Sequence, residues 1–206
     1  MATQATKEDP FKQYGHHAED MRVALNDIAP DMAYKLGNME WMNEIKAGVR
    51  YKNGETLSPL TEKMFLASAI MELATTRDHS AALARNLAAA GEPKPSGEVS
   101  THHIVAWNAQ AARRSRLLLF AWCIAINDKD NGVHLPSNRR ARVKTLPDAI
   151  KHSRIHTTIY HSQVFLRLQQ EARTNGKDTD VGRRALRNIK QKILNGSFPY
   201  LPEHIA

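Results

Sequence analysis

Long apolar runs, cysteines and aromatic residues are scarce in this chain of 206 residues, and each shortage narrows the class of protein. No stretch of about 18 uncharged apolar residues exists, so the sequence predicts no membrane span and no membrane partner. The N-terminal residues lack the apolar core of a secretory signal peptide, which favours a cytoplasmic location in the producing cell. Cys123 is the one cysteine, so an intramolecular disulfide is excluded and its apolar neighbours predict a buried side chain.

Positive charge is confined to one half of the chain. Residues 1–94 carry 11 Lys and Arg against 13 Asp and Glu, whereas residues 95–206 carry 18 against 8. The net charge of +8 therefore belongs to the second half, as expected of a surface that binds a polyanion such as nucleic acid. A solvated basic surface would give the same count, so charge alone does not decide between the two.

Proline and glycine divide the chain into two regions. The segment GEPKPSGE (91–98) separates a helical N-terminal region, residues 1–94, from the basic region, residues 95–206. Upstream, we expect helical structure over about 15–50, a turn at the Asn-Gly pair of 51–56, and helix over 60–90 that residues 75–78 can divide in two. Downstream, we expect short strands in 101–108 and 131–136, and helices in 109–126, 147–170 and 181–196.

Seven of the ten histidines follow residue 95, and four of them form two close pairs. His102 and His103 are adjacent in an expected strand, so their side chains should point to opposite sides. His152 and His156 are four residues apart, which on a helix places both on one face within reach of one cation. Neutral imidazole is a common ligand of divalent metals, and three imidazoles leave positions open for water or phosphate oxygen.

Three segments together form a more specific pattern: THHIVAWN, INDKDNGVHLP and HSRIHTTIY. In this order they resemble the ββα-metal nucleases, or HNH superfamily, and most closely its AHH branch, which is found largely in bacterial toxin domains. The resemblance covers residues 98–170, with Thr101 where the branch usually has alanine. It implies a mainly α-helical fold with a small ββα-metal (HNH-type) core in residues 95–206, preceded by the helical N-terminal region.

The resemblance also implies a role for each polar residue of the pattern. His103 is expected to be the general base that activates a water molecule, a task that suits an imidazole near its normal pKa. Asn131 is expected to brace the loop and orient His103 through its backbone. One divalent metal ion (Mg, Mn, Zn or Ni) is expected on three histidines: His102, His152 and His156. His102 and His103 can exchange these roles, and either downstream histidine can contact phosphate instead.

Residues around this pattern have weaker interpretations. Tyr160, one turn beyond His156, is expected to support a ligand, contact phosphate or pack in the core. Three arginines flank the site in sequence and are expected to bind backbone phosphates, although each can equally be solvated: Arg139, Arg140 and Arg154. The helix over 181–196 either extends this basic surface or is simply amphipathic. Among the other histidines, we interpret His134 and His161 as structural residues and His79 as a surface residue.

These features predict a metal-dependent endonuclease that hydrolyses phosphodiester bonds. A DNase of low sequence specificity is favoured because no recognition helix or zinc finger is evident. An RNase of the same fold and a non-catalytic nucleic-acid-binding protein with a structural metal site are the alternatives, and the absence of cysteine from the pattern weighs against the second. The toxin resemblance implies an antibacterial effector delivered into a target cell's cytoplasm, an acidic immunity protein, and a delivery, adaptor-binding or folding role for residues 1–94.

Overall fold

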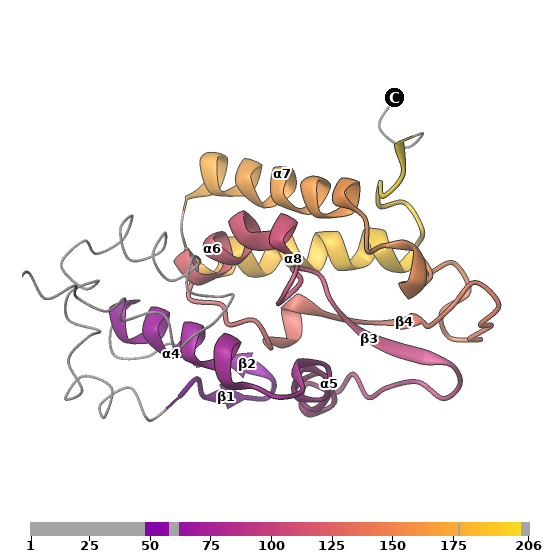
Figure 1. Ribbon diagram of the computed structural model, residues 1–206, viewed down its shortest axis with the longest axis horizontal. Helices are drawn as coiled ribbons and strands as arrows, with labels where there is room; N and C mark the ends of the chain where they lie inside the picture. The colour runs from indigo at the N-terminus through magenta and orange to yellow at the C-terminus, as the bar shows by residue number, and fades with distance from the viewer. Residues whose placement is uncertain (1–47, 58–61, 177, 203–206) are drawn as a thin grey trace, which may run out of the picture.

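The structure is a computed structural model that describes residues 48–57, 62–176 and 178–202 (Figure 1). Most of the helical segment expected over residues 15–50 lies outside these ranges. About half of the described chain is helical, and its strands form two small antiparallel sheets. Among the described helices, none combines the length and the apolar character that crossing a bilayer requires.

The described chain begins with a hairpin and two helices: β1 (Tyr51–Lys52), β2 (Glu55–Thr56), α4 (Glu62–Thr75) and α5 (His79–Ala89). Asn53 and Gly54 form the hairpin turn with positive φ angles of 51° and 75°, which confirms the predicted Asn-Gly turn. The side chain of Asp78 caps α5 by accepting a hydrogen bond from the amide of Ala81 at 2.9 Å. This cap separates the two helices within the break predicted at residues 75–78.

The second part of the chain contains the elements that carry the histidine pairs: β3 (Val99–His103), α6 (Arg113–Ala121), β4 (Gly132–Pro136), α7 (Thr158–Asn175) and α8 (Thr179–Leu194). β3 and β4 are antiparallel, with His102 opposite Val133 and His103 opposite Gly132. The order β3, β4 and α7 is compatible with a small ββα nuclease core. The helix expected over 109–126 ends earlier, at Ala121, and Cys123 then takes a positive φ of 54°.

The β3–β4 sheet lies between two groups of elements (Figure 1). Helices α6, α7 and α8 lie on one side of it, and α4, α5 and the β1–β2 hairpin lie on the other. One hydrophobic core includes Ile70 of α4, Ile104 after β3 and Leu186 of α8. Packing contacts therefore cross residue 94, and a division of the chain at that residue stays a prediction.

The helix predicted over 147–170 is wrong in its first half. It begins only at Thr158, and the upstream segment contains a single 3-10 turn, His152–Arg154. Thr157 has extended backbone angles and its Oγ1 accepts a hydrogen bond from the amide of Tyr160 at 3.0 Å. An N-cap of this kind marks the start of a helix, so the spacing of the upstream histidines is not helical.

Candidate active site

Three histidines from separate segments converge in the structure. His102 lies on β3, His152 in the 3-10 turn and His156 directly before the cap of α7. One ligand nitrogen of each residue lies within 4.8 Å of the other two. The Nε2 atoms of His152 and His156 are 3.1 Å apart, which is close to the separation of about 3 Å between two nitrogens that bind one zinc-sized ion. A turn and a loop, rather than the predicted helix, bring the two nitrogens together.

Tyr160 determines which nitrogen of His102 can act as a ligand. This residue of α7 has a fully buried side chain, and its hydroxyl donates a hydrogen bond to the carbonyl oxygen of Ile104 at 3.0 Å. Because the hydroxyl has only one proton, its contact of 3.0 Å with Nε2 of His102 requires that Nε2 be the donor. The lone pair of His102 is then on Nδ1. A metal-binding histidine typically donates its other N–H to the protein in this way.

The electrostatic environment keeps the three imidazoles neutral. Burial and the neighbouring histidines hold the pKa of His102 well below its usual value, and burial with His156 nearby lowers the pKa of His152 to about 4. Burial also lowers the pKa of His156. A neutral imidazole is the form that binds a metal ion, so these donors fit a divalent cation at pH 7. Within the described ranges, no carboxylate, cysteine or further histidine joins the cluster.

His103 follows His102 in β3 but lies among other residues. Its side chain is 5% exposed. Nε2 of His103 lies 3.0 Å from Oδ1 of Asn127, and the ring meets that of His79 edge-on with 6.2 Å between centroids. Burial lowers the pKa of His103 to about 4. This differs from the near-normal pKa expected from the sequence, because the sequence does not reveal how completely the residue is desolvated.

Asn131 fixes the backbone that follows His103. Its fully buried side chain donates from Nδ2 to the carbonyl oxygens of Ile126 at 2.8 Å and Val105 at 3.2 Å, and its Oδ1 accepts from the amide of Val105 at 2.8 Å. Its own carbonyl accepts from the amide of Ile104 at 2.8 Å. Three of these bonds connect the end of β3 to the turn that precedes β4, and the bond to Ile126 connects that turn to the chain after α6.

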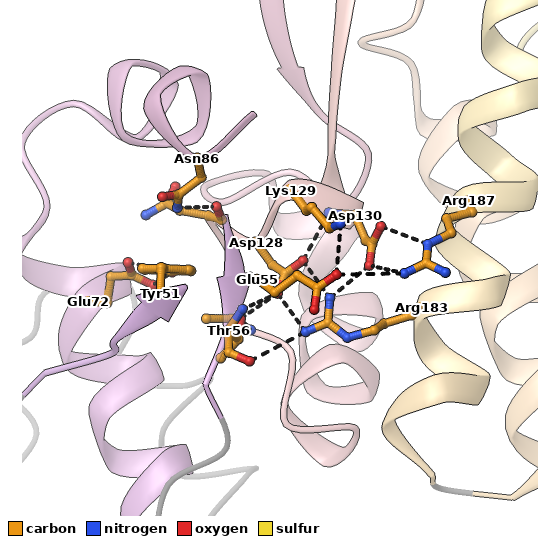
Figure 2. A network of polar contacts seen from close by, with 12 residues as sticks. Tyr51, Glu55, Thr56, Glu72, Asn86, Asp128, Lys129, Asp130, Arg183 and Arg187 are labelled. Atoms are coloured by element: carbon orange, nitrogen blue, oxygen red, sulfur yellow. Dashed lines mark hydrogen bonds and ion pairs between the residues drawn. The ribbon is translucent and has the colours of Figure 1, made fainter. Parts of the chain in front are cut away.

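The loop before β4 is held by a buried ion network (Figure 2). Arg183 of α8 contacts Asp128 at 3.0 Å and Asp130 at 2.7 Å, and Arg187 contacts Asp130 at 2.9 Å. Asp128 also accepts hydrogen bonds from the amide and the hydroxyl of Thr56, at 2.7 Å and 2.6 Å. The β1–β2 hairpin and α8 are thereby joined through this loop.

Most of the cationic side chains of α8 are paired with carboxylates of the protein. Arg183 is 6% exposed and Lys190 is 8% exposed, and the ammonium group of Lys190 is paired with the carboxylate of Glu92. Arg187 is also paired, while Arg184 is exposed. The helix is therefore amphipathic: three of its cations balance carboxylates of the same molecule, while Arg184 and Lys192 are exposed to solvent.

The three arginines proposed to bind phosphate are all exposed. Arg139 and Arg140 follow β4, and together with Ser153 of the 3-10 turn they line an open hollow on the surface. Glu98 and Asn138 complete the lining of this hollow. The guanidinium group of Arg154 lies over the ring of Tyr200, 5.8 Å from its centroid.

Two buried residues beside His103 are not predicted by the sequence patterns. His79, interpreted as a surface residue, is only 2% exposed, so that interpretation is wrong. Its Nε2 lies 3.1 Å from the carbonyl oxygen of Leu73, and its ring stacks on Trp107 with 4.6 Å between centroids. No motif marks His79. Asn127 lies in the INDKDNG segment, in which the resemblance implies a role only for Asn131.

Comparison with known proteins identifies the family to which the chain belongs. A family model described as a nuclease family of the HNH/ENDO VII superfamily with conserved AHH matches residues 83–193. Neither the curated proteins nor the solved structures contain a match. The matched range is more than half of the chain and includes the three converging histidines, so the protein is a nuclease, and its substrate is a nucleic acid. The chain belongs to the AHH family of this superfamily, whose nucleases are metal-dependent.

Proposed function

We propose that the chain is a metal-dependent endonuclease that hydrolyses phosphodiester bonds of DNA with low sequence specificity. The observation that carries the proposal is the convergence of His102, His152 and His156, each with a nitrogen within 4.8 Å of the other two. This arrangement lies inside the part of the chain that matches a nuclease family.

The donor set suits an open, catalytic metal site. His102 through Nδ1, together with His152 and His156, would hold one divalent cation. When bound, the cation would neutralise the charge that develops on phosphate and stabilise the leaving oxygen. Imidazole ligands favour Zn²⁺ or Ni²⁺ by affinity, whereas phosphate chemistry favours Mg²⁺ or Mn²⁺. A purely structural zinc site usually closes four positions with protein ligands, and three histidines do not.

His103 is the proposed general base, which takes a proton from the attacking water. Its lowered pKa keeps the imidazole unprotonated at neutral pH, which is the form that a base requires. An exchange of roles with His102 is disfavoured, because Tyr160 occupies Nε2 of His102 and the lone pair on Nδ1 remains for the cation. Asn131 holds the backbone on which His103 depends.

Binding of the nucleic acid is assigned to exposed arginines that contact its backbone. Arg139 and Arg140 line the hollow beside the 3-10 turn of His152, and Arg154 belongs to that turn. Contacts to phosphate position a nucleic acid without reading its bases, which agrees with low sequence specificity. The same residues could bind RNA, so the assay below includes both polymers.

The biological role is inferred from the resemblance to toxin nucleases. We propose an antibacterial effector that is kept inactive in the cytoplasm of the producer and acts in the cytoplasm of a target cell. The exposed arginines beside the histidine cluster are a surface that an acidic immunity protein would complement. Residues 1–94 are assigned to delivery, to binding of an adaptor or chaperone, or to folding.

The test is a cleavage assay with purified protein, plasmid DNA and RNA, in the presence of Mg²⁺, Mn²⁺, Zn²⁺, Ni²⁺ or a chelator. We expect metal-dependent cutting that His103→Ala abolishes while Zn²⁺ binding is retained, and that His134→Ala, at a buried histidine outside the cluster, preserves. A protein that unfolds on chelation and cuts neither polymer would instead hold a structural metal. Cutting by His103→Ala at the wild-type rate would refute the role of His103.

A further inference from the structure

Asn127 connects His103 to parts of the chain that lie before the family match. Its Oδ1 lies 3.0 Å from Nε2 of His103 and 3.2 Å from Nδ1 of His79. His79 is the first residue of α5, and its Nε2 lies 3.1 Å from the carbonyl oxygen of Leu73 near the end of α4. Because oxygen acceptors face both of its ring nitrogens, His79 can donate to both only as an imidazolium. The matched range begins at residue 83, so His79 is outside it. The side-chain amide of Asn127 thus links the proposed base, His103, to α5 and, through His79, to α4.

Glu72 is a partly buried carboxylate whose pKa is affected by this amide. The hydroxyl of Tyr51 donates to its carboxylate at 2.7 Å, and the pKa of Glu72 is raised by burial against the opposing effects of Tyr51 and Asn127. The buried amide nitrogen of Asn127 makes no hydrogen bond within the described residues. Oδ1 of Asn127 faces both histidines, and an amide oxygen can only accept a hydrogen bond.

The backbone around Asn127 is held from the same upstream elements. Asn86 of α5 donates to the carbonyl oxygen of Asn127 at 2.7 Å. Thr56 of β2 bonds both Asp128 and the amide of Ala125, and Figure 2 shows Thr56 and Asn86 beside this loop. The position of the amide is therefore fixed by side chains of β2 and α5 as well as by its own contacts.

We propose that Asn127, supported by His79, is a positioning residue that holds His103 in the tautomer with a proton on Nε2 and the lone pair on Nδ1. The proposal rests on the assignment of His103 as the general base. Nδ1 is then the nitrogen that takes the proton from water, and the segment before residue 83 becomes part of what makes the base competent. Without the acceptor oxygen, the imidazole can change tautomer or rotate, and the fraction of competent enzyme falls.

The first experiment reads the tautomer directly. Long-range ¹H–¹⁵N spectra of the ¹⁵N-labelled full chain, with His103→Gln to assign the signal, distinguish a protonated Nε2 from a protonated Nδ1. We expect Nε2–H in the wild type and a mixture of both tautomers in Asn127→Ala. A wild-type His103 protonated on Nδ1 would overturn the proposal, whatever the cleavage activity.

The second experiment separates positioning from stability through steady-state cleavage kinetics. In Asn127→Ala we expect kcat to fall about 10- to 100-fold, with KM and Zn²⁺ affinity changed less than about twofold. Asn127→Asp, which keeps an acceptor oxygen, should recover part of kcat. His79→Phe keeps an aromatic ring beside Trp107 but loses the contact to Asn127, so it should lower kcat, whereas the control His134→Phe at a similarly buried histidine should not.

The outcomes distinguish this proposal from the function on which it rests. If the wild type cuts, His103→Ala does not, and Asn127→Ala retains full kcat, the positioning role is wrong while the nuclease mechanism stands. If His79→Phe and His134→Phe lower kcat equally and in proportion to lost stability, the role of His79 is merely structural and that part is overturned. If the wild type cuts neither polymer with any metal, the base assignment and the positioning role are both overturned.

Discussion

At the scale of single residues, the hydroxyl of Tyr160 shows how one buried group specifies the chemistry of another. It gives its proton to a backbone carbonyl and can therefore only accept from His102. The ring orientation and the tautomer of His102 follow from this one contact. A phenylalanine would fill the same space without specifying either.

Tyr160→Phe is therefore expected to weaken metal binding by about 10- to 100-fold, the usual effect of removing a group that orients a ligand. Isothermal titration of the chelator-treated protein with Zn²⁺ measures it. Tyr51→Phe is the matched control, because it also removes a tyrosine hydroxyl, but one that is bonded to Glu72 and not to any of the three histidines. Equal Zn²⁺ affinities of the two variants would contradict the orienting role.

Asn131→Ala is expected to lower the free energy of unfolding by about 3 kcal/mol or more, because it leaves buried backbone groups of Val105 and Ile126 without partners. Urea denaturation measures the loss. Asn131→Asp keeps the acceptor for the amide of Val105 but loses both donors, so its stability should not reach that of the wild type. A loss below about 1 kcal/mol in the alanine variant would show that the loop relaxes around the gap.

At the scale of elements, some structure is specified locally and some is not. Asn53-Gly54 and the Asp78 cap act within a few residues, so the hairpin turn and the start of α5 could be predicted from the sequence. The segment before α7 could not be predicted, because the cap at Thr157 makes the helix start only at Thr158, while the spacing of the histidines upstream mimics a helical period. His102 and its partners were found through the resemblance. The contact of Asn127 with His79 joins positions 48 residues apart and has no local signal.

The β1–β2 turn also makes a testable close contact. A Cβ added to Gly54 would lie 2.0 Å from the carbonyl oxygen of Asn86, at a φ of +75°. Gly91 has a similar φ of +83° but open space around its Cα. Gly54→Ala is therefore expected to lower the thermal midpoint clearly more than Gly91→Ala, whose cost is limited to about 1 kcal/mol of backbone strain. Equal melting temperatures for the two variants would mean that the hairpin moves away from α5 without loss.

At the scale of the whole molecule, the buried network around Asp128 and Asp130 joins the N-terminal hairpin, the central loop and α8 (Figure 2). Arg183→Met leaves two buried carboxylates without this cation and should cost about 3 to 5 kcal/mol of unfolding free energy. Arg184→Met, at the exposed neighbouring position, should change it by less than about 0.5 kcal/mol. Denaturation curves that coincide for the two variants would show that the network contributes no stability.

Stability without metal should fall as the pH falls from about 6.5 to about 4. Burial lowers the pKa of His103 to about 4, and burial with His156 and Arg116 nearby lowers that of His161 to about 4. In this window the unfolded chain binds protons that the folded chain does not, so the free energy of unfolding decreases by up to about 1.4 kcal/mol per pH unit for each such histidine. Urea titrations at several pH values measure the slope.

His161→Phe removes one of these groups and should make the pH dependence shallower. Glu72 acts in the opposite direction, because its raised pKa gives stability below its unfolded pKa that is lost as the pH rises through the folded value. An equal pH dependence for His161→Phe and the wild type would show that His161 takes up a proton in the folded state as readily as in the unfolded chain.

Because cations of α8 are paired inside the molecule, the net charge of +8 overstates the number of positive groups that can contact a polyanion. Arg183 and Lys190 are already paired with carboxylates of the protein, so they are not free to neutralise phosphates and release the counterions that are condensed on a nucleic acid. The loop after β4 keeps its arginines in solvent. We expect the cations that stay exposed, among them Arg139, Arg140 and Arg154 near the histidines, to set the ionic-strength dependence of nucleic-acid binding.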